Sequence, residues 1–315
     1  MSGSIDPEPV ILERKEPYMS KIFLIGGTGL VGTKLQKKLL ENGHTLTVYS
    51  RRRKNLDVQT HGITMTDQIH QDALAHHDVV INLAGAGIFD QAWTKSRKLE
   101  LIRSRVTLTQ NLTQALNRLE ESVRPKLLIQ ISAVGYYGTS WTKSFTEESP
   151  AGDDFLAVLC KDWEQAAKGF LGKVSVARLG IVLSLDGGML KKIQPLFRLL
   201  LGGPLDSGKQ WISWIHIDDA VDILAYMLTA APQTYNLVAP QTVRQEAFAK
   251  TLGSQMGRPS FFPTSGILLR FILGERAHYL VTGQKVLPDA LLKKGYHFKF
   301  TTLKDAFSAL LKTQS

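Results

Sequence analysis

Apolar and polar positions along the chain follow a repeating rhythm of short apolar runs and longer helical patterns. Short apolar runs with the length and bounds of buried strands occur at 21–25, 44–50, 62–66, 78–85, 126–138 and 173–184. Apolar residues recur with the spacing of one helix face at 30–40, 97–118 and 153–170. Strands that alternate with helices in this way are typical of a parallel sheet covered on both faces. The pattern therefore predicts an α/β fold with a doubly wound parallel sheet.

The rhythm changes after Ser184, where glycine-rich loops are followed by a strand at 211–217, a helix at 218–228 and a strand at 234–239. The remaining residues have mainly helical patterns. We therefore expect a dinucleotide-binding domain at 19–184, to which 211–240 returns, and a small, mainly helical C-terminal substrate domain made of 185–210 and 241–315. Residues 1–18 show no periodicity and are interpreted as a flexible leader or as residues added by an expression vector.

Composition excludes several classes of protein. The 315 residues are 43% hydrophobic and 21% charged, as in globular proteins. Apolar runs such as 267–273 are far shorter than a membrane span and this one is broken by Arg270, so no membrane partner is expected. The net charge of +10 is scattered apart from the cluster at 51–54, which argues against a nucleic-acid partner. One cysteine, Cys160, excludes an internal disulfide and a cysteine zinc cluster, so we expect no metal and a cytoplasmic location.

The stretch "IGGTGLVG" joins the first strand to the first helix and carries the clearest chemical signal. Its glycines fit the spacing GxxGxxG, and Gly27 also allows GxGxxG. Such a turn brings backbone N–H groups and the positive end of a helix to a pyrophosphate, and only glycine permits the close approach. We therefore predict that a dinucleotide contacts Gly26, Thr28, Gly29, Leu30, Val31 and Gly32.

The second strand predicts which dinucleotide is bound. NAD is usually held by an acidic residue at the end of this strand, but no residue between His44 and Leu56 is acidic. Ser50, Arg51 and Arg52 stand there instead, and guanidinium groups are suited to a 2′-phosphate. NADP (NADPH) is the predicted cofactor, although a basic turn that is merely solvated remains the alternative.

Several longer motifs resemble a known family. "IGGTGLVG", "VINLAG", "ISAVGYYG" and "WIHIDDAV" together resemble the extended short-chain dehydrogenase/reductase superfamily. "INLAGAGIFDQAW", "IRSRVTLTQNL", "LGGPLDSGKQWISWIHI" and "GERAHYLVTGQKVLP" are similar to its atypical NAD-dependent epimerase/dehydratase-like branch, also labelled the nucleoside-diphosphate-sugar epimerase family. The resemblance covers about residues 19–311. It implies a Rossmann domain and a small C-terminal domain that closes over the reactive end of the cofactor.

The resemblance also implies roles for particular residues. The adenosine side of the cofactor would contact Asn82, Leu83, Ala84 and Gly85. The nicotinamide would lie near Ser132, Ala133 and 179–182. Superfamily enzymes use a tyrosine as acid/base and a lysine four positions later, which lowers the tyrosine's pKa. The alignment puts Leu156 and Cys160 at those positions, so the usual pair is missing. The usual catalytic serine falls on Ser132 or Ala133, depending on the register.

Two tyrosines are candidates to replace the missing acid. Tyr136 and Tyr137 follow the fifth strand at the point where a substrate would face the nicotinamide. With Ser132 they form the predicted catalytic set, and packing of the two aromatic rings is the alternative.

The glycine-rich loop and the strand after it supply the predicted substrate pocket. The residues assigned to it are Gln210, Trp211, Trp214 and His216. A structural role is the alternative for His216, and core packing is the alternative for Trp214. We expect Asp218 to cap the helix that follows, and Asp153 or Asp154 to cap the helix at 153–170.

Two functions remain open at this point. The first is an NADP-binding oxidoreductase or epimerase-like enzyme that acts on a small or nucleotide-linked carbonyl or alcohol. The alternative is a non-catalytic NADPH-binding sensor or scaffold protein, which the missing Tyr–Lys pair would favour. A small-molecule substrate is the expected partner, and the long helices at 97–118 and 153–170 leave a homodimer open.

Overall fold

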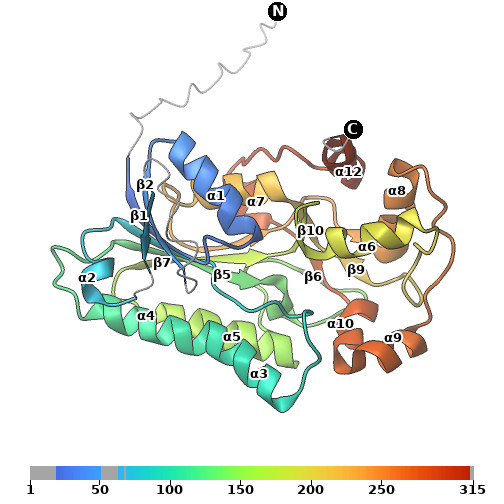
Figure 1. Ribbon diagram of the computed structural model, residues 1–315, viewed down its shortest axis with the longest axis horizontal. Coiled ribbons are helices and arrows are strands. Elements are labelled where there is room, and N and C mark those ends of the chain that lie inside the picture. Colours follow the sequence, from blue (N-terminus) through green and yellow to red (C-terminus); the bar gives the residue numbers. More distant parts are fainter. Residues whose placement is uncertain (1–18, 51–62, 67–68, 313–315) are drawn as a thin grey trace, which may run out of the picture.

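The computed structural model describes residues 19–50, 63–66 and 69–312, and its centre is a parallel sheet (Figure 1). The strands of this sheet are β1 (Lys21–Ile25), β2 (Thr45–Tyr49), β3 (Ile63–Thr66), β4 (Val79–Asn82), β5 (Leu127–Ala133), β7 (Lys173–Leu179) and β11 (Thr234–Leu237). Their spatial order is β11-β7-β5-β4-β1-β2-β3, and every pair is parallel. The order reverses between β1 and β4, which is where ligands bind in such sheets. The predicted doubly wound fold is confirmed.

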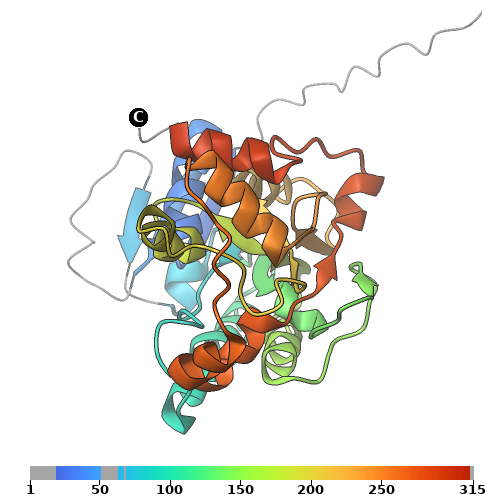
Figure 2. The same cartoon turned by 90° about the vertical axis from the view of Figure 1, so that its right-hand side faces the viewer.

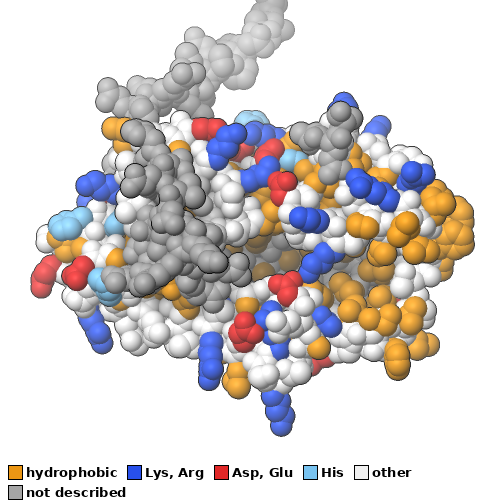
Figure 3. Space-filling model, viewed as in Figure 1, with side chains coloured by type: hydrophobic (Ala, Val, Ile, Leu, Met, Phe, Trp, Pro, Cys, Tyr) orange, Lys and Arg blue, Asp and Glu red, His pale blue; other side chains and the backbone are white. Residues whose placement is uncertain are grey.

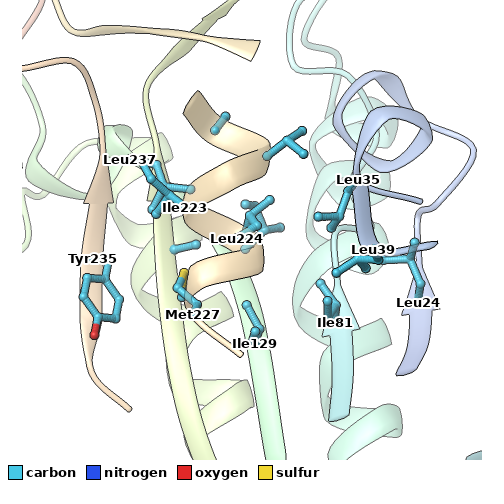
Figure 4. Packing of buried hydrophobic residues seen from close by; sticks show 14 of the residues in the cluster. Leu24, Leu35, Leu39, Ile81, Ile129, Ile223, Leu224, Met227, Tyr235 and Leu237 are labelled. Carbon is cyan, nitrogen blue, oxygen red and sulfur yellow. The ribbon is translucent and has the colours of Figure 1, made fainter. Parts of the chain in front are cut away.

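Helices cover both faces of the sheet. One face carries α1 (Leu30–Glu41) and α7 (Ile217–Tyr226), and the other carries α2 (Gln71–Leu74), α4 (Leu108–Asn117) and α5 (Phe155–Lys168) (Figure 1). Leu35 and Leu39 of α1 and Leu224 of α7 meet side chains of β1, β4 and β5 on the first face (Figure 4). Because the sheet is buried on both sides, its strands are continuous apolar runs, and this explains why their positions could be predicted.

One predicted strand is in fact two. The run at 173–184 ends its pairing with the central sheet at Leu179, and β8 (Ile181–Leu183) pairs instead with β10 (Trp214–His216). Gly180 lies at the break, where a Cβ atom would come 2.7 Å from the carbonyl oxygen of Ser213. Only glycine lets the two backbones cross so closely, so the chain leaves the sheet at this residue.

The predicted helix at 97–118 is interrupted. It begins as α3 (Lys95–Ile102), passes through one π-helical turn, η2 (Arg103–Thr107), and continues as α4. Such turns hold one residue more than an α-turn and are frequent at functional sites. The segment Arg103–Thr107 is therefore a candidate part of a functional site.

A second core lies beside the sheet and faces the viewer in Figure 2. Phe197, Trp214, Phe248 and Phe307 are buried in it. Its elements are α6 (Gly188–Arg198), β8, β9 (Trp211–Ile212), β10, β12 (Val243–Arg244), α8 (Gln245–Gln255) and α12 (Leu303–Lys312).

The remaining elements are short. They are η3 (Val134–Tyr137), β6 (Ser144–Phe145), α9 (Gly266–Leu273), η4 (Gly274–Ala277), α10 (His278–Val281), β13 (Lys285–Val286) and α11 (Asp289–Lys293). None of the helices in the described ranges combines the length and the apolarity that crossing a membrane requires.

Candidate functional site

The glycine turn between β1 and α1 is built so tightly that side chains are excluded from it. Gly26 has a φ of +79°, and a Cβ atom there would lie 2.8 Å from the carbonyl group of Leu83. A Cβ atom on Gly32 would lie 2.4 Å from the carbonyl oxygen of Gly26. The Gln36 amide holds the turn by donating a hydrogen bond of 2.7 Å to the carbonyl of Gly27. The turn, the start of α1 and the end of β4 are thus packed backbone against backbone.

The amino end of α1 is free to bind an anion. Its cap residue, Gly29, offers no side-chain hydrogen bond, and the first turn holds no acidic residue. The first N–H groups of the helix have no partner within the helix, and the helix dipole makes this end positive. Thr28 and Gly29 are exposed and Leu30 is half-buried, so the turn is open to a ligand. We call the turn Gly26–Gly29 together with the start of α1 up to Gly32 the glycine cradle. The diphosphate of a dinucleotide fits this cradle, because its glycines keep it clear of side chains.

Asn82 shapes the neighbouring edge of the cradle from within the core. Its buried amide donates to Thr109 Oγ1 at 3.0 Å and to Gln130 Oε1 at 2.9 Å, and its oxygen accepts a hydrogen bond from Ala84 N at 3.2 Å. The last of these fixes the turn that carries Leu83, Ala84 and Gly85 past the cradle. Asn82 therefore positions this backbone, and the three residues after it are the ones that a ligand would meet.

The residues predicted to select the cofactor are only partly described. Ser50 follows β2 and is buried. Arg51 and Arg52 lie outside the described residues. The prediction that they bind a 2′-phosphate therefore remains a prediction.

A cavity of about 260 Å³ lies at the carboxyl ends of β5 and β7. Ala133 at the end of β5 and Leu179 at the end of β7 line it, together with Gly180 and Ile181. Most of the remaining lining is apolar and aromatic, from Ile88, Phe89, Leu156, Leu159, Trp163, Trp211, Ile212 and Tyr279. In open α/β sheets this edge holds the ligand. The cavity thus occupies the place expected for the reacting ends of cofactor and substrate.

Arg105 brings a positive charge to this apolar cavity. Among the described residues that line it, Arg105 is the only cation. The guanidinium donates to the carbonyl of Ala86 at 2.8 Å, lies over the Trp163 ring, and has no carboxylate partner in the described ranges. Burial lowers its pKa to about 10, which still leaves it charged at neutral pH. A buried guanidinium without a counter-charge is costly and favours an anionic or strongly polar ligand oxygen.

The two positions to which the family resemblance assigns the usual acid/base pair also face this cavity. Leu156 and Cys160 lie one turn apart on α5, and both line it. Burial raises the pKa of the Cys160 thiol to about 11, so it is neutral at physiological pH. Neither side chain can act as the usual tyrosine or lysine. Arg105 lines the same cavity as Cys160, so the cavity still contains a cation.

Asp154 and Tyr279 close another side of the cavity. Asp154 caps α5, as predicted, by accepting hydrogen bonds from Leu156 N and Ala157 N. The Tyr279 hydroxyl donates to the same carboxylate at 3.2 Å, and burial together with Asp154 raises the pKa of this tyrosine. Tyr279 therefore stays protonated, and its hydrogen bond to Asp154 links the C-terminal segment to the start of α5.

Comparison with known proteins adds the family. A profile described as the NAD dependent epimerase/dehydratase family matches residues 22–154, and a domain of unknown function, DUF1731, matches 264–310. The chain is 36% identical over 309 residues to the chloroplastic epimerase family protein SDR39U1 homolog of Arabidopsis thaliana, covering 95% of this chain and 88% of the relative. It is 35% identical over 299 residues to the Homo sapiens epimerase family protein SDR39U1, covering 92% and 99%. The chain belongs to the SDR39U1 epimerase family.

Solved structures agree with this assignment. The crystal structure of human SDR39U1 with NADPH matches this SDR39U1-family chain with a TM-score of 0.85 and 34% identity, covering 93% of this chain and 99% of the human one. MoeE5 in complex with UDP-glucose and NAD has a TM-score of 0.73 at 17% identity, which shows a shared fold only. The predicted family resemblance is confirmed, and a nicotinamide dinucleotide is the cofactor of the family to which the chain belongs.

In this SDR39U1-family protein the two predicted catalytic tyrosines contact a buried ion pair and are not among the residues that line the cavity. The Tyr137 hydroxyl donates to Asn236 at 2.6 Å and accepts from Arg178 at 2.9 Å, and burial raises its pKa to about 12. Arg178 in turn makes two hydrogen bonds of 2.8 Å to Glu164 and lies over the Tyr136 ring. The third predicted catalytic residue, Ser132, is buried in β5, one position before the cavity residue Ala133.

The predicted substrate-pocket residues are separated by the structure. Trp211 lines the cavity, with its indole N–H bonded to the carbonyl of Trp141 and Arg244 over its ring. Gln210 is buried and its amide donates to the carbonyls of Leu205 and Leu280, which ties the glycine-rich loop to α10. Trp214 is fully buried in the second core. Of the four, Trp211 is the one that reaches the cavity.

His216 is a structural residue at the start of α7. Its Nδ1 accepts a hydrogen bond from Asp218 N at 3.1 Å, so His216, and not Asp218 as predicted, caps this helix. The reason is that β10 ends at His216 and the helix begins at once, which leaves Asp218 in the first turn. The ring centroids of His216 and Phe300 lie 3.9 Å apart. Burial lowers the pKa of His216 to about 4.

This low pKa predicts a pH-dependent stability. The folded state favours neutral His216, so its contribution is complete above the ordinary pKa of 6.5 and is lost as pH falls towards about 4. At 1.36 kcal/mol per pKa unit the loss is on the order of 3 kcal/mol. We expect His216→Asn, which keeps a capping acceptor, to reduce this loss when urea unfolding is measured across the same pH range. An unchanged pH dependence in the variant would assign the effect to other groups.

Arg105 is the main site residue that the predictions missed. The helical spacing carried a signal, because Leu101, Arg105 and Leu112 fall on one buried face. A charged residue in such a stripe must have a partner or a ligand. The signal was weakened because Arg97 and Arg103 lie nearby and look equally suited to solvent.

Among the residues that the structure describes, no group of three or more His, Cys, Asp or Glu side chains is placed to hold a metal.

Proposed function

We propose that this protein is an NADP-dependent oxidoreductase or epimerase-like enzyme that acts on a small carbonyl or alcohol held in the cavity beside Arg105. The observation that carries the proposal is this cavity, which combines an apolar lining with one buried guanidinium at the carboxyl ends of β5 and β7. The glycine cradle and the NADPH bound to human SDR39U1 support the cofactor.

The cofactor would supply hydride chemistry, and the protein would supply orientation and charge. Arg105 is the residue that we assign to the substrate oxygen. Its planar set of N–H donors can hold a carbonyl oxygen and stabilise the negative charge that this oxygen gains as it becomes an alkoxide. The surrounding apolar side chains exclude water and strengthen this interaction.

The cavity lining favours a small substrate with a large apolar part. Trp163, Leu156 and Leu159 form a face without hydrogen-bonding groups, apart from the indole N–H of Trp163, which donates to Thr109. We propose that the enzyme works without the usual Tyr–Lys pair, because Leu156 and Cys160 occupy those positions. An activated carbonyl, whose alkoxide needs less help from an acid, suits such a site.

The alternative function is a non-catalytic NADPH sensor or scaffold. The lack of the Tyr–Lys pair supports it. The cavity beside Arg105, a cation without a carboxylate partner among the described residues, supports the enzyme. The single cysteine fits a reducing, cytoplasmic compartment, where we place either activity.

The deciding experiment separates binding from turnover. NADPH fluorescence with the purified protein first reports binding, and oxidation of NADPH is then followed across aldehydes, quinones and sugar nucleotides. We expect binding, and turnover with small apolar carbonyls. Binding without turnover on the whole panel would support the sensor, and absence of binding would contradict both functions.

A charge reversal tests the choice of NADP. We expect Arg51→Glu combined with Arg52→Glu to weaken NADPH binding by at least about 100-fold and NADH binding by only a few-fold, because each charged hydrogen bond to a phosphate is worth about 1.5–3 kcal/mol. Fluorescence titrations with both dinucleotides measure the ratio. The matched control is Arg53→Glu with Lys54→Glu, which changes the same charge next to the pair. Equal weakening of NADPH and NADH would show that Arg51 and Arg52 do not bind the 2′-phosphate.

A further inference from the structure

Helix α9 presents an apolar surface to solvent. Ile267, Phe271 and Ile272 are 78%, 88% and 62% exposed, and Gly266 is its one buried residue. Of the seventeen large apolar side chains that the described residues leave exposed, ten lie at the end of α6 or in and before α9. These ten form what we call the apolar patch: Leu196, Leu199, Leu200, Leu201, Phe261, Phe262, Ile267, Leu268, Phe271 and Ile272.

The two halves of the apolar patch are joined through the backbone. Thr264 N donates to the carbonyl of Pro204, and Asp206 N donates to the carbonyl of Thr264, each at 2.8 Å. Gly203 lies directly against the backbone of Phe262. The end of α6 and the segment before α9 are therefore neighbours, and Figure 3 shows apolar side chains gathered over α6 and α9 on one side of the molecule.

Basic side chains outnumber acidic ones around the apolar patch, where Asp206 is an acid in direct contact with α9 and its carboxylate lies against Gly266. Segments 187–205 and 247–274 contain six lysines and arginines and no aspartate or glutamate. Arg198, Arg258 and Arg270 are exposed there. The nearest acids along the chain are Asp206 and Glu275, and Glu275 is paired with Lys98 at 2.7 Å. This excess of basic side chains favours a partner that accepts apolar side chains and carries negative charge.

We propose that the apolar patch docks on an anionic lipid bilayer, with α9 lying in the plane of the headgroups. Eight residues of helix cannot cross a bilayer, but a short helix with Phe, Leu and Ile on one side and arginine beside them is suited to lie in the interface. Basic side chains near an anionic leaflet add about 1 kcal/mol each. A second copy of the chain is a poorer fit, because a symmetric interface would bring like charges together. The prediction of no membrane partner was based on the lack of a membrane-spanning segment. It does not apply to a helix that lies in the plane of the headgroups.

Vesicle sedimentation tests the proposal on the full chain. We expect binding to vesicles of phosphatidylcholine mixed with phosphatidylglycerol, little binding to phosphatidylcholine alone, and release by salt. Ile267→Ser with Phe271→Ser should lower the bound fraction at least about tenfold, since each exposed side chain is worth about 1.5–3 kcal/mol when buried. Arg258→Gln with Arg270→Gln should remove the preference for the anionic vesicles.

The matched control replaces exposed apolar side chains elsewhere. Val158→Ser with Leu171→Ser changes two exposed residues at α5 and after it, and binding should be unchanged. Thermal unfolding shows that each variant is folded. Equal binding by wild type and the Ile267/Phe271 variant, or no binding to either vesicle, would overturn the proposal. So would a concentration-dependent dimer in light scattering that the same variant dissociates.

Discussion

Gly32→Ala should remove dinucleotide binding almost completely. The new methyl group would lie 2.4 Å from the carbonyl oxygen of Gly26 and 2.6 Å from Cα of Gly27, so the start of α1 must move away from the turn. Both contacts are with backbone, which cannot swing aside as a side chain can. We expect NADPH affinity to fall by at least about 100-fold, or roughly 3 kcal/mol, in a fluorescence titration. A folded Gly32→Ala protein that binds NADPH as well as wild type would show that the diphosphate lies elsewhere.

The control is Gly257→Ala. Gly257 has a φ of +62° but no atom within 4 Å of a Cβ atom, so the substitution adds backbone strain without a clash at the cradle. NADPH affinity should be unchanged in this variant. If Gly32→Ala does not fold, Thr28→Glu and Thr28→Gln replace it. Thr28 is exposed in the turn, and only the glutamate would repel a diphosphate.

Arg105→Met should abolish most of the turnover while leaving NADPH binding within a few-fold of wild type. The guanidinium is the one cation among the described cavity residues, and removing a single donor to a developing oxyanion typically costs about 10²–10³ in rate. Stability should change little, because Arg105 is bonded to carbonyl and hydroxyl oxygens and to no carboxylate in the described ranges. The rate of NADPH oxidation and the unfolding midpoint are the two measurements.

Two further variants separate charge from shape. Arg105→Lys keeps the charge but loses the planar set of donors, so we expect partial activity. Arg124→Met is the control, because Arg124 is half-buried and, like Arg105, is bonded to carbonyl oxygens, those of Asn117 and Leu119, but lies away from the cavity. Its turnover should match wild type. Full activity in Arg105→Met would remove Arg105 from the mechanism and favour another residue of the cavity.

The sequence predicted the central sheet and the cradle because both leave local patterns. Buried strands must be apolar along their whole length, and a backbone turn against α1 and β4 must be glycine at Gly26 and Gly32. Each requirement is visible within a few neighbouring residues. The family resemblance added the C-terminal part, where local patterns were weaker.

Features that depend on contacts distant in sequence were predicted less well. The break at Gly180 is set by Ser213, which is 33 positions away, and a single glycine in an apolar run did not reveal it. Both His216 and Asp218 can cap a helix. His216 does so because β10 ends there and α7 begins at the next residue. Trp211 and Trp214 have the same side chain, yet one lines the cavity and the other is buried in the second core.

The π-helical turn that carries Arg105 has an evolutionary consequence. A π turn differs from an α turn by one residue, and one residue along a helix rotates a side chain by about 100°. Loss of a single codon within Arg103–Thr107 would restore a regular helix from Lys95 to Asn117 and would change the register between α3 and α4. A one-codon insertion or deletion in relatives could therefore change which side chains of this segment face the cavity, while the sheet and the cradle beneath it stay intact.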